Sequence, residues 1–336
     1  MKKILVIYTG GTIGMVKDTL TSSLIPFDLK QISEVIPPLK KLRCKINTFK
    51  FEHIIDSSNM KPAFWIELVE VIEKNYNDYD GFVVLHGTDT MSYTASALSF
   101  MMENLSKPVI LTGSQLPLDA IRTDGRENIV SAIEIAANDE VEIPEVCVFF
   151  DNKLFRANRT TKINAEYFEA FYSGNYPSLA KVGINISYKG HLLLPKPRGN
   201  FKAYKKLCDD VIIIKIHPAL KEKYLRTMLE TENLKAVILE TYGSGNAPTD
   251  KWFIQLIQQT INRGIIVYNV TQCKAGSVAM GHYQTSHELL KIGVLSGYDI
   301  TTEAALTKLM FLLGNFTEKT EINKLLDTNM RGEITK

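Results

Sequence analysis

The sequence predicts an α/β protein built from two stacked domains whose sheets are mostly parallel. Short apolar runs alternate along the whole chain with segments in which apolar residues recur at helical spacing. Repeated strand–helix units of this kind place helices on both faces of a mostly parallel sheet. The length of 336 residues suits two domains, and the alternation breaks over residues 189–205, where glycines and prolines indicate a linker.

We therefore expect a larger flavodoxin- or Rossmann-like N-terminal domain over residues 1–190, a linker over 191–209 and a smaller C-terminal α/β domain over 210–336. The expected strands are the apolar runs at 4–8, 49–55, 81–85, 108–111, 146–150, 211–216, 236–239 and 265–270. The expected helices begin at Pro62, just after Thr90, and at Asp124, Trp252 and Thr302. Residues 15–27 are polar and mixed, and we expect a loop there.

Composition and charge exclude several classes of function. The net charge is only +2 and the basic residues are spread along the chain, so no nucleic-acid surface is indicated. No cationic amphipathic stretch points to a membrane surface, and no apolar run is long enough to span a bilayer. The four cysteines are far apart and lack a C-x-x-C pair, which favours free thiols over zinc or disulfides. The apolar run behind Met1 is too short for a signal peptide, so we expect a cytoplasmic protein.

Small polar residues follow several predicted strands at the point where each strand ends. In open parallel sheets, ligands bind outside the carboxyl ends of the strands. If the strands are neighbours, these residues converge on one crevice that suits a polar small molecule. A hydroxyl at a strand end can equally well cap the next helix, as Thr88, Asp89 or Thr90 can here. The segments concerned are Thr12, Ser57-Ser58, Thr88-Asp89 and Thr112 to Ser114.

Thr12 is the candidate nucleophile, because glycines at 10, 11 and 14 leave it with little steric cover. Their spacing does not match G-x-G-x-x-G, no Gly-Lys-Ser/Thr follows, and no G-x-S-x-G occurs elsewhere. His287-Glu288 begins H-E-x-x-H, but the fifth residue is Lys291. A hydroxyl nucleophile needs a neighbour that takes its proton. Lys162 and Asp89 are the candidates with a tunable pKa, although Thr160-Thr161-Lys162 also fits an ordinary surface strand.

Long motifs in this chain resemble those of the bacterial-type L-asparaginases, in particular the cytoplasmic type I branch. The two signature-like motifs are Tyr8-Thr9-Gly10-Gly11-Thr12-Ile13-Gly14 and Leu85-His86-Gly87-Thr88-Asp89-Thr90-Met91. The resemblance continues through Asp56-Ser57-Ser58-Asn59-Met60, Leu111-Thr112-Gly113-Ser114-Gln115-Leu116-Pro117, Asn158-Arg159-Thr160-Thr161-Lys162 and Tyr242-Gly243-Ser244-Gly245-Asn246-Ala247-Pro248. It therefore spans nearly the whole chain.

The resemblance implies hydrolysis of L-asparagine to L-aspartate and ammonia, with Thr12 as nucleophile and a second catalytic cluster of Thr88, Lys162 and Asp89. Whether Lys162 relays a proton or supplies positive charge stays open. No cofactor and no metal are implied. Family members are homotetramers built from pairs of tight dimers, in which the neighbour's second domain completes each site. The residues matched to substrate binding are Gly11, Ser57, Ser58, Thr88, Asp89, Ser114 and, from that neighbour, Asn246.

The chain departs from the family pattern at two places. Many members carry a tyrosine in the loop after the nucleophile, whereas residues 13–30 contain none and Leu24 stands near that position. Glu240 replaces the arginine that binds an activating asparagine in some cytoplasmic members, which argues against activation through the same contacts. We also expect residues 14–27 to form a mobile lid. The alternative functions are a non-catalytic amino-acid sensor and an asparaginase-like subunit of a tRNA-dependent amidotransferase.

Overall fold

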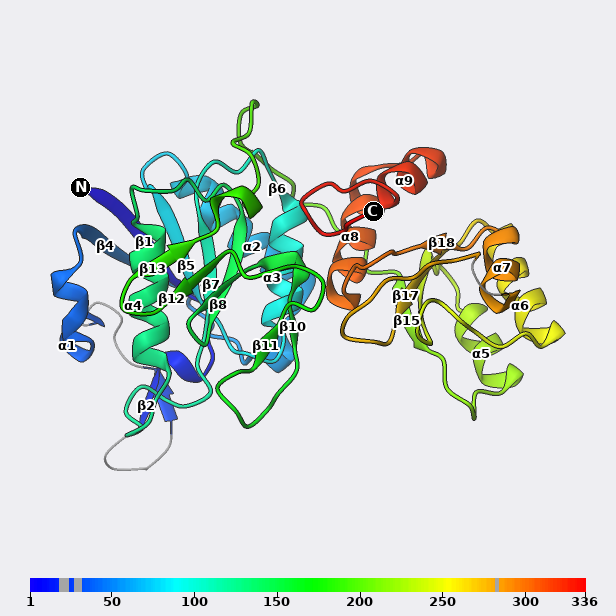
Figure 1. Cartoon of the computed structure of the whole chain (residues 1–336), viewed down its shortest axis with the longest axis horizontal. Helices are drawn as coiled ribbons and strands as arrows, with labels where there is room; N and C mark the ends of the chain where they lie inside the picture. The colour runs from blue at the N-terminus through cyan, green and yellow to red at the C-terminus, as the bar shows by residue number, and fades with distance from the viewer. Residues whose placement is uncertain (18–23, 27–31, 282–283) are drawn as a thin grey trace. The chain divides into compact units, whose positions relative to one another are not determined.

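The computed structural model describes residues 1–17, 24–26, 32–281 and 284–336, and the chain forms two compact units (Figure 1). The first unit comprises Met1–Lys205 and the second comprises Lys206–Lys336. Each unit has its own sheet and its own buried apolar core. The α/β class and the larger N-terminal part agree with the prediction.

The first unit is organised around an 8-stranded sheet with a parallel half and an antiparallel half. The parallel strands are, in spatial order, β4 (Cys44–Lys50), β1 (Lys2–Tyr8), β5 (Gly81–Leu85), β7 (Val109–Thr112) and β8 (Val146–Phe150). Counted along the chain, this order is 2-1-3-4-5, which is that of flavodoxin-like sheets. The sheet continues in antiparallel fashion through β9 (Lys153–Arg156), β12 (Ala180–Val182) and β13 (Ile186–Tyr188).

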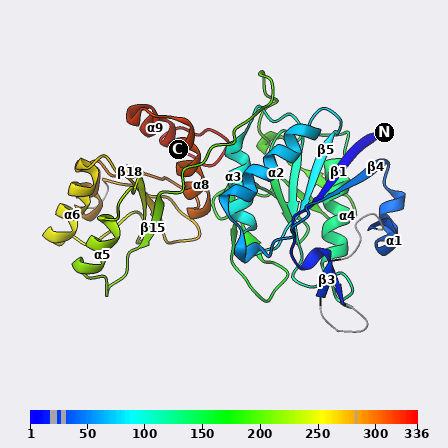
Figure 2. The same ribbon diagram turned by 180° about the vertical axis from the view of Figure 1, so that it is seen from behind.

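Helices cover both faces of the parallel half (Figures 1 and 2). One face packs against α4 (Gly125–Ala136) and α1 (Ile32–Val35), and the other packs against α2 (Pro62–Asn75) and α3 (Met91–Met101). Alternation along β1 explains this arrangement, because Ile4, Val6 and Tyr8 belong to the buried cluster that includes α4 and Leu5 and Ile7 point the other way. All five residues of β5 are buried, as expected for a central parallel strand.

Two predicted elements are wrong in the first unit. The run 49–55 is not the second strand, which is β4 at Cys44–Lys50. Its register is set by β1, with Lys2 opposite Cys44 and Tyr8 opposite Lys50, where β1 itself ends. Beyond that point the ladder gives way to isolated backbone hydrogen bonds, from Phe51 N to the Tyr8 carbonyl and from Ile55 N to the Thr9 carbonyl. As an edge strand it is only partly buried, and polar residues interrupt the apolar pattern that would have marked it.

Residues 15–27 are not simply a loop, because β2 (Met15–Lys17) pairs antiparallel with β3 (Leu24–Pro26). The intervening residues 18–23 lie outside the described part of the chain, as do residues 27–31. The mobile lid that we predict over 14–27 therefore falls partly on residues that are not described, and stays a prediction.

The second unit contains a 4-stranded parallel sheet in chain order. Its strands are β15 (Val211–Lys215), β16 (Ala236–Thr241), β17 (Ile266–Thr271) and β18 (Leu295–Ser296). Helices α5 (Glu222–Leu229), α6 (Lys251–Asn262) and α7 (Gln284–Lys291) share one apolar cluster with this sheet. Helices α8 (Thr302–Asn315) and α9 (Lys319–Leu326) pack on each other, and α8 also contacts β15, β16 and β17.

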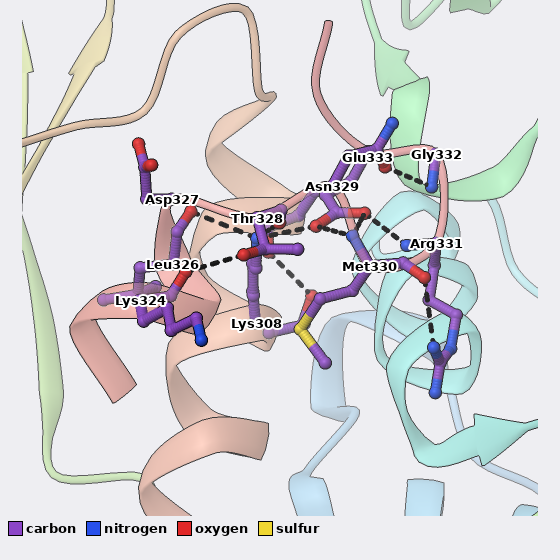
Figure 3. Close-up of polar contacts among 12 residues, drawn as sticks. Lys308, Lys324, Leu326, Asp327, Thr328, Asn329, Met330, Arg331, Gly332 and Glu333 are labelled. Atoms are coloured by element: carbon purple, nitrogen blue, oxygen red, sulfur yellow. Dashed lines mark hydrogen bonds and ion pairs between the residues drawn. The ribbon is translucent and has the colours of Figure 1, made fainter. Parts of the chain in front are cut away.

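The C-terminal segment is fastened to α8 by a buried ion pair (Figure 3). Lys308 Nζ lies 2.6 Å from Glu333 Oε1, and both side chains have no exposed surface. The ammonium group also donates to the carbonyls of Leu326 and Thr328, and the carboxylate accepts from the backbone N–H groups of Met330 and Arg331. The charges are therefore paired and hydrogen-bonded, which is the condition for burying them.

Candidate active site

The loops that follow β1 and β5 meet at the switch point of the first sheet, where the strand order reverses. Gly11, in the first loop, has φ +88°, and a Cβ placed on it would lie 2.4 Å from the nitrogen of Gly87 in the second. A Cβ on Gly87 would lie 2.5 Å from Ser57 Oγ, which belongs to the segment after β4. Glycine at both positions therefore lets three backbone segments touch.

The loop after β7 joins the same group. A Cβ on Gly113 would lie 2.5 Å from the carbonyl oxygen of His86 and 3.3 Å from Thr88 Cγ2. The convergence of strand ends that the sequence indicates is thus present, and close packing at these glycines contributes to it. Ser114, which follows Gly113, is buried, and its hydroxyl donates to the carbonyl of Leu116 at 2.7 Å.

Thr12 begins the short 3-10 helix η1 (Thr12–Gly14) and is partly exposed. Gly14 packs directly on the ring of Tyr8, where a Cβ would lie 2.2 Å from ring carbons. The Tyr8 hydroxyl donates to the carbonyl of Gly11 at 3.2 Å. Burial raises the pKa of Tyr8, so this phenol stays protonated and keeps its donor role. The end of β1 itself thereby holds the loop that carries Thr12.

Ser57 and Ser58 lie in η4 (Ser57–Asn59), whose N-cap is Asp56. The Asp56 Oδ1 accepts from Ser58 N and from Ser58 Oγ, both at 2.9 Å, and these hydrogen bonds lower the pKa of Asp56. Ser57 is buried, and Thr90 Oγ1 donates to its carbonyl at 2.7 Å. Thr90 occupies the N-cap position of α3 without a side-chain cap bond, so its hydroxyl connects the two loops instead.

The Lys162 side chain contacts both Thr88 and Asp89 in the loop after β5. Its Nζ lies 2.8 Å from Thr88 Oγ1 and 2.7 Å from Asp89 Oδ1. The lysine side chain is 19% exposed and the aspartate 62%. Lys162 is carried by β10 (Thr161–Lys162), which pairs with β11 (Phe171–Tyr172), far from β5 in the sequence. The short strand is therefore part of the site.

Gln115, Asp124 and Asn128 are site residues that sequence reasoning missed. The Thr88 hydroxyl donates to Gln115 Oε1 at 3.3 Å, because an amide oxygen only accepts, and the same hydroxyl oxygen accepts from the Lys162 ammonium group. Both carboxylate oxygens of Asp124 lie 3.1 Å from Gln115 N, and Asn128 Nδ2 donates to the carbonyl of Gly113 at 2.9 Å. The sequence offered one signal: Asp124 and Asn128 are polar, lie four positions apart at the start of a predicted helix and therefore share one face of it.

Asn246 lies in the second unit, in the turn after β16, and the structure does not place it relative to the loops of the first unit. Its backbone closes the turn through reciprocal hydrogen bonds with Tyr242 at 2.8 and 2.9 Å. Glu240, at the end of β16, accepts a hydrogen bond from Thr302 Oγ1 at 2.6 Å. The other predicted site residues all belong to the first unit.

The chain belongs to the asparaginase family. Residues 3–193 match the family described as "Asparaginase, N-terminal", and residues 210–326 match "Glutaminase/Asparaginase C-terminal domain". Together the two matches cover most of both units. This agrees with the family resemblance of the sequence motifs.

Three relatives are similar over the whole chain. L-asparaginase 1 of Escherichia coli K12 is 43% identical over 335 residues, covering 99% of this chain and 98% of that protein. The structure of L-asparaginase I from Vibrio cholerae matches with a TM-score of 0.90 and 42% identity, covering 99% of each chain. The mouse 60 kDa lysophospholipase is 38% identical, over 99% of this chain and 63% of that protein. No helix in the described part of this chain is long and apolar enough to cross a membrane.

Proposed function

We propose that this protein is an L-asparaginase, which hydrolyses L-asparagine to L-aspartate and ammonia through an acyl-enzyme on Thr12. One observation carries the proposal: Lys162 Nζ bridges Thr88 Oγ1 at 2.8 Å and Asp89 Oδ1 at 2.7 Å, on the loop whose Gly87 packs against Gly11. Similarity to an L-asparaginase over the full length favours this activity over an amino-acid sensor or an amidotransferase subunit.

The proposed substrate grip follows from its charges. L-asparagine carries an α-carboxylate, an α-ammonium group and a side-chain amide. The hydroxyl groups of Ser57 and Ser58 suit the carboxylate, and Asp89 suits the ammonium group. The backbone at Ser114 meets the amide. The partly exposed Asp89 is available for this contact in addition to its ion pair with Lys162.

The proposed reaction has two steps. Thr12 Oγ bonds to the amide carbon and gives up its proton, the C–N bond breaks, and the nitrogen takes a proton and leaves as ammonia. Water then attacks the ester, which releases L-aspartate and restores the Thr12 hydroxyl. Backbone N–H groups at Gly11 and Thr88 stabilise the oxyanion, each by roughly a hundred- to a thousandfold. The Thr88–Lys162–Asp89 cluster moves the protons or supplies charge, worth roughly a hundred- to ten-thousandfold.

The direct test compares Thr12→Val with the wild type. The variant should bind L-aspartate, measured by calorimetry, and lose ammonia release from L-asparagine. Thr9→Val is the matched control, since its hydroxyl donates to the carbonyl of Leu85 at 3.0 Å and is buried away from the proposed substrate. Ammonia release by Thr12→Val at the rate of Thr9→Val would refute the nucleophile.

We also propose a homotetramer built from pairs of tight dimers, in which Asn246 of one subunit completes the site of its neighbour. Supporting this, the segment 163–172 beside Lys162 exposes four large apolar side chains, of which Tyr167 is 70% exposed. Such a cluster is typical of an interface. The other three are Ile163, Phe168 and Tyr172. The thiols at 44, 147, 208 and 273 are free, which suits the proposed cytoplasmic location.

Subunit mixing tests the shared site. Thr12→Val and Asn246→Ala proteins should each be nearly inactive. If sites are shared, refolding them together forms hybrid dimers in which one site has both intact residues, and about a quarter of all sites regain activity. Absence of recovery, with hybrids confirmed by mass spectrometry, would place each site within one subunit.

A further inference from the structure

His86 lies directly after β5 and its imidazole is fully buried beneath the loop that carries Thr88 and Asp89. Its Nδ1 lies 2.6 Å from the carbonyl oxygen of Gly87, and its Nε2 lies 3.0 Å from Thr94 Oγ1 on α3. Trp65 Nε1, on α2, lies 3.0 Å from the same threonine oxygen. One imidazole therefore connects the loop to two helices.

The chemistry of the partners sets the direction of each hydrogen bond. A carbonyl oxygen only accepts, so Nδ1 carries the proton and donates to Gly87. Burial lowers the pKa of His86 to about 4, so the ring is neutral near pH 7 and Nε2 is an acceptor. Thr94 Oγ1 then donates to Nε2 and accepts from Trp65 Nε1. In this series of hydrogen bonds, from Trp65 through Thr94 and His86 to Gly87, every donor has one acceptor. The arrangement leaves a single tautomer for the His86 ring.

The bond to Gly87 controls the peptide group that Gly87 shares with Thr88. The Gly87 carbonyl and the Thr88 N–H belong to one planar trans unit, so they point in opposite directions. Glycine has no side chain that would limit rotation of this unit. Because the carbonyl is held toward the buried ring, the N–H of Thr88 points away from the helix layer and toward the space outside the carboxyl ends of the strands.

We infer that His86 is a positioning residue for the proposed reaction, because its Nδ1–H holds the Gly87 carbonyl and so keeps the Thr88 N–H directed at the oxyanion. This inference rests on the proposed function, in which that N–H stabilises the oxyanion. His86 itself touches no reacting atom. Its effect should therefore be on kcat rather than on the binding of ground-state substrate.

Two amide variants separate the two ring nitrogens. In His86→Asn the side-chain amide nitrogen takes the place of Nδ1 and still reaches Gly87, whereas in His86→Gln the amide lies near the Nε2 position and reaches Thr94 only. We expect His86→Gln to lower kcat by about a hundredfold with little change in KM, as for a misaligned oxyanion donor. We expect His86→Asn to keep kcat within about tenfold of the wild type.

A merely structural role predicts a different result, because both variants would then lose folded protein alike and turn over normally per folded molecule. Equal kcat values for His86→Asn and His86→Gln, measured on protein shown to be folded by circular dichroism, would overturn the inference. A wild type that releases no ammonia would instead refute the proposed function.

A measurement on the unaltered protein guards against variants that fail to fold. The chain has six histidines, so 15N labelling of histidine gives a readable spectrum. We expect His86 to show a protonated Nδ1 and an unprotonated Nε2 throughout pH 5 to 8, whether or not the enzyme is active. A protonated Nε2 in that range would contradict the inference, because the ring would no longer be held as a donor to Gly87 alone.

Discussion

Removal of one charge from the Lys308–Glu333 pair should destabilise the second unit more than any loss of a surface ion pair (Figure 3). The atoms Nζ and Oε1 are 2.6 Å apart and neither side chain is exposed. In Glu333→Gln the Lys308 ammonium group would stay buried among neutral oxygens, including the carbonyls of Leu326 and Thr328, with no negative charge to pair with it. Breaking a buried pair in this way costs about 3–5 kcal/mol.

The pKa of Lys308 supports a cost in this range. Burial lowers this pKa, and the negative charge of Glu333 opposes that effect. Without Glu333 the ammonium group must either remain charged in an apolar site or lose its proton, and both states raise the free energy of the folded protein. Lys308→Met should cost a similar amount, because it leaves the Glu333 carboxylate buried without its cation. The double variant should cost less than the sum of the two, by about 1–3 kcal/mol.

The assay is urea unfolding followed by Trp252 fluorescence in a Trp65→Phe background, since the chain has two tryptophans and Trp252 lies in the second unit. Glu222→Gln is the matched control. Its pair with Arg226 on α5 has the same 2.6 Å separation, but both side chains are more than two fifths exposed. We expect no measurable loss there. Equal midpoints for Glu333→Gln and Glu222→Gln, or strict additivity in the double variant, would refute the reasoning.

Three further predictions concern residues of the first unit, namely Lys162, Gly11 and His86. Lys162→Met should lower kcat by roughly a hundred- to ten-thousandfold while aspartate still binds. Lys162→Arg keeps the positive charge but cannot release a proton, so if Lys162 relays a proton, this variant should lose as much kcat as Lys162→Met. Gly11→Ala should lower the free energy of unfolding by about 2–5 kcal/mol, because the new Cβ adds strain at a positive φ and overlaps the backbone of Gly87. Gly264→Ala is the control: its φ is +93° but the space around it is open, so it should show the strain at positive φ without the overlap. The pKa of His86 is near 6.5 in the unfolded chain and about 4 in the folded protein, so the free energy of unfolding should fall as the pH falls below 6.5. The loss should reach about 2–3 kcal/mol near pH 4.5. His86→Asn, which has no imidazole to protonate, should not show this loss in calorimetry.

Much of the parallel sheet was predictable because buried central strands have a simple signature. Gly81–Leu85 and Val146–Phe150 are continuous apolar runs, and the structure places both where the sequence predicts strands. The edge strand β4 was not predictable in this way, because its outward residues are polar and its position depends on pairing with β1. The short strands β9, β12 and β13 escaped notice because three or four residues are too few to show a period, although β9 follows β8 directly and β12 and β13 are neighbours in the chain.

The same division holds for the candidate site. Thr12, Thr88 and Asp89 follow strands directly, so the rule that ligands bind at the carboxyl ends of parallel strands was enough to group them. Lys162 entered as a candidate base, but its distances to Thr88 and Asp89 follow from the β10–β11 pairing. Gln115 and Asp124 are polar residues of ordinary appearance in the sequence, and only their contacts with Thr88 and the loop after β7 reveal a role.

By itself, the sequence determined the α/β class, the asparaginase resemblance and the residues at the strand ends, because periodicity and short motifs are local properties of the chain. Tertiary structure alone decided the strand order 2-1-3-4-5, which puts the loops of Gly11 and Gly87 in contact. It alone decided the hydrogen bonds that run from Trp65 through Thr94 and His86 to Gly87. These depend on which distant segments are neighbours in space, and such pairings result from burying the whole core together.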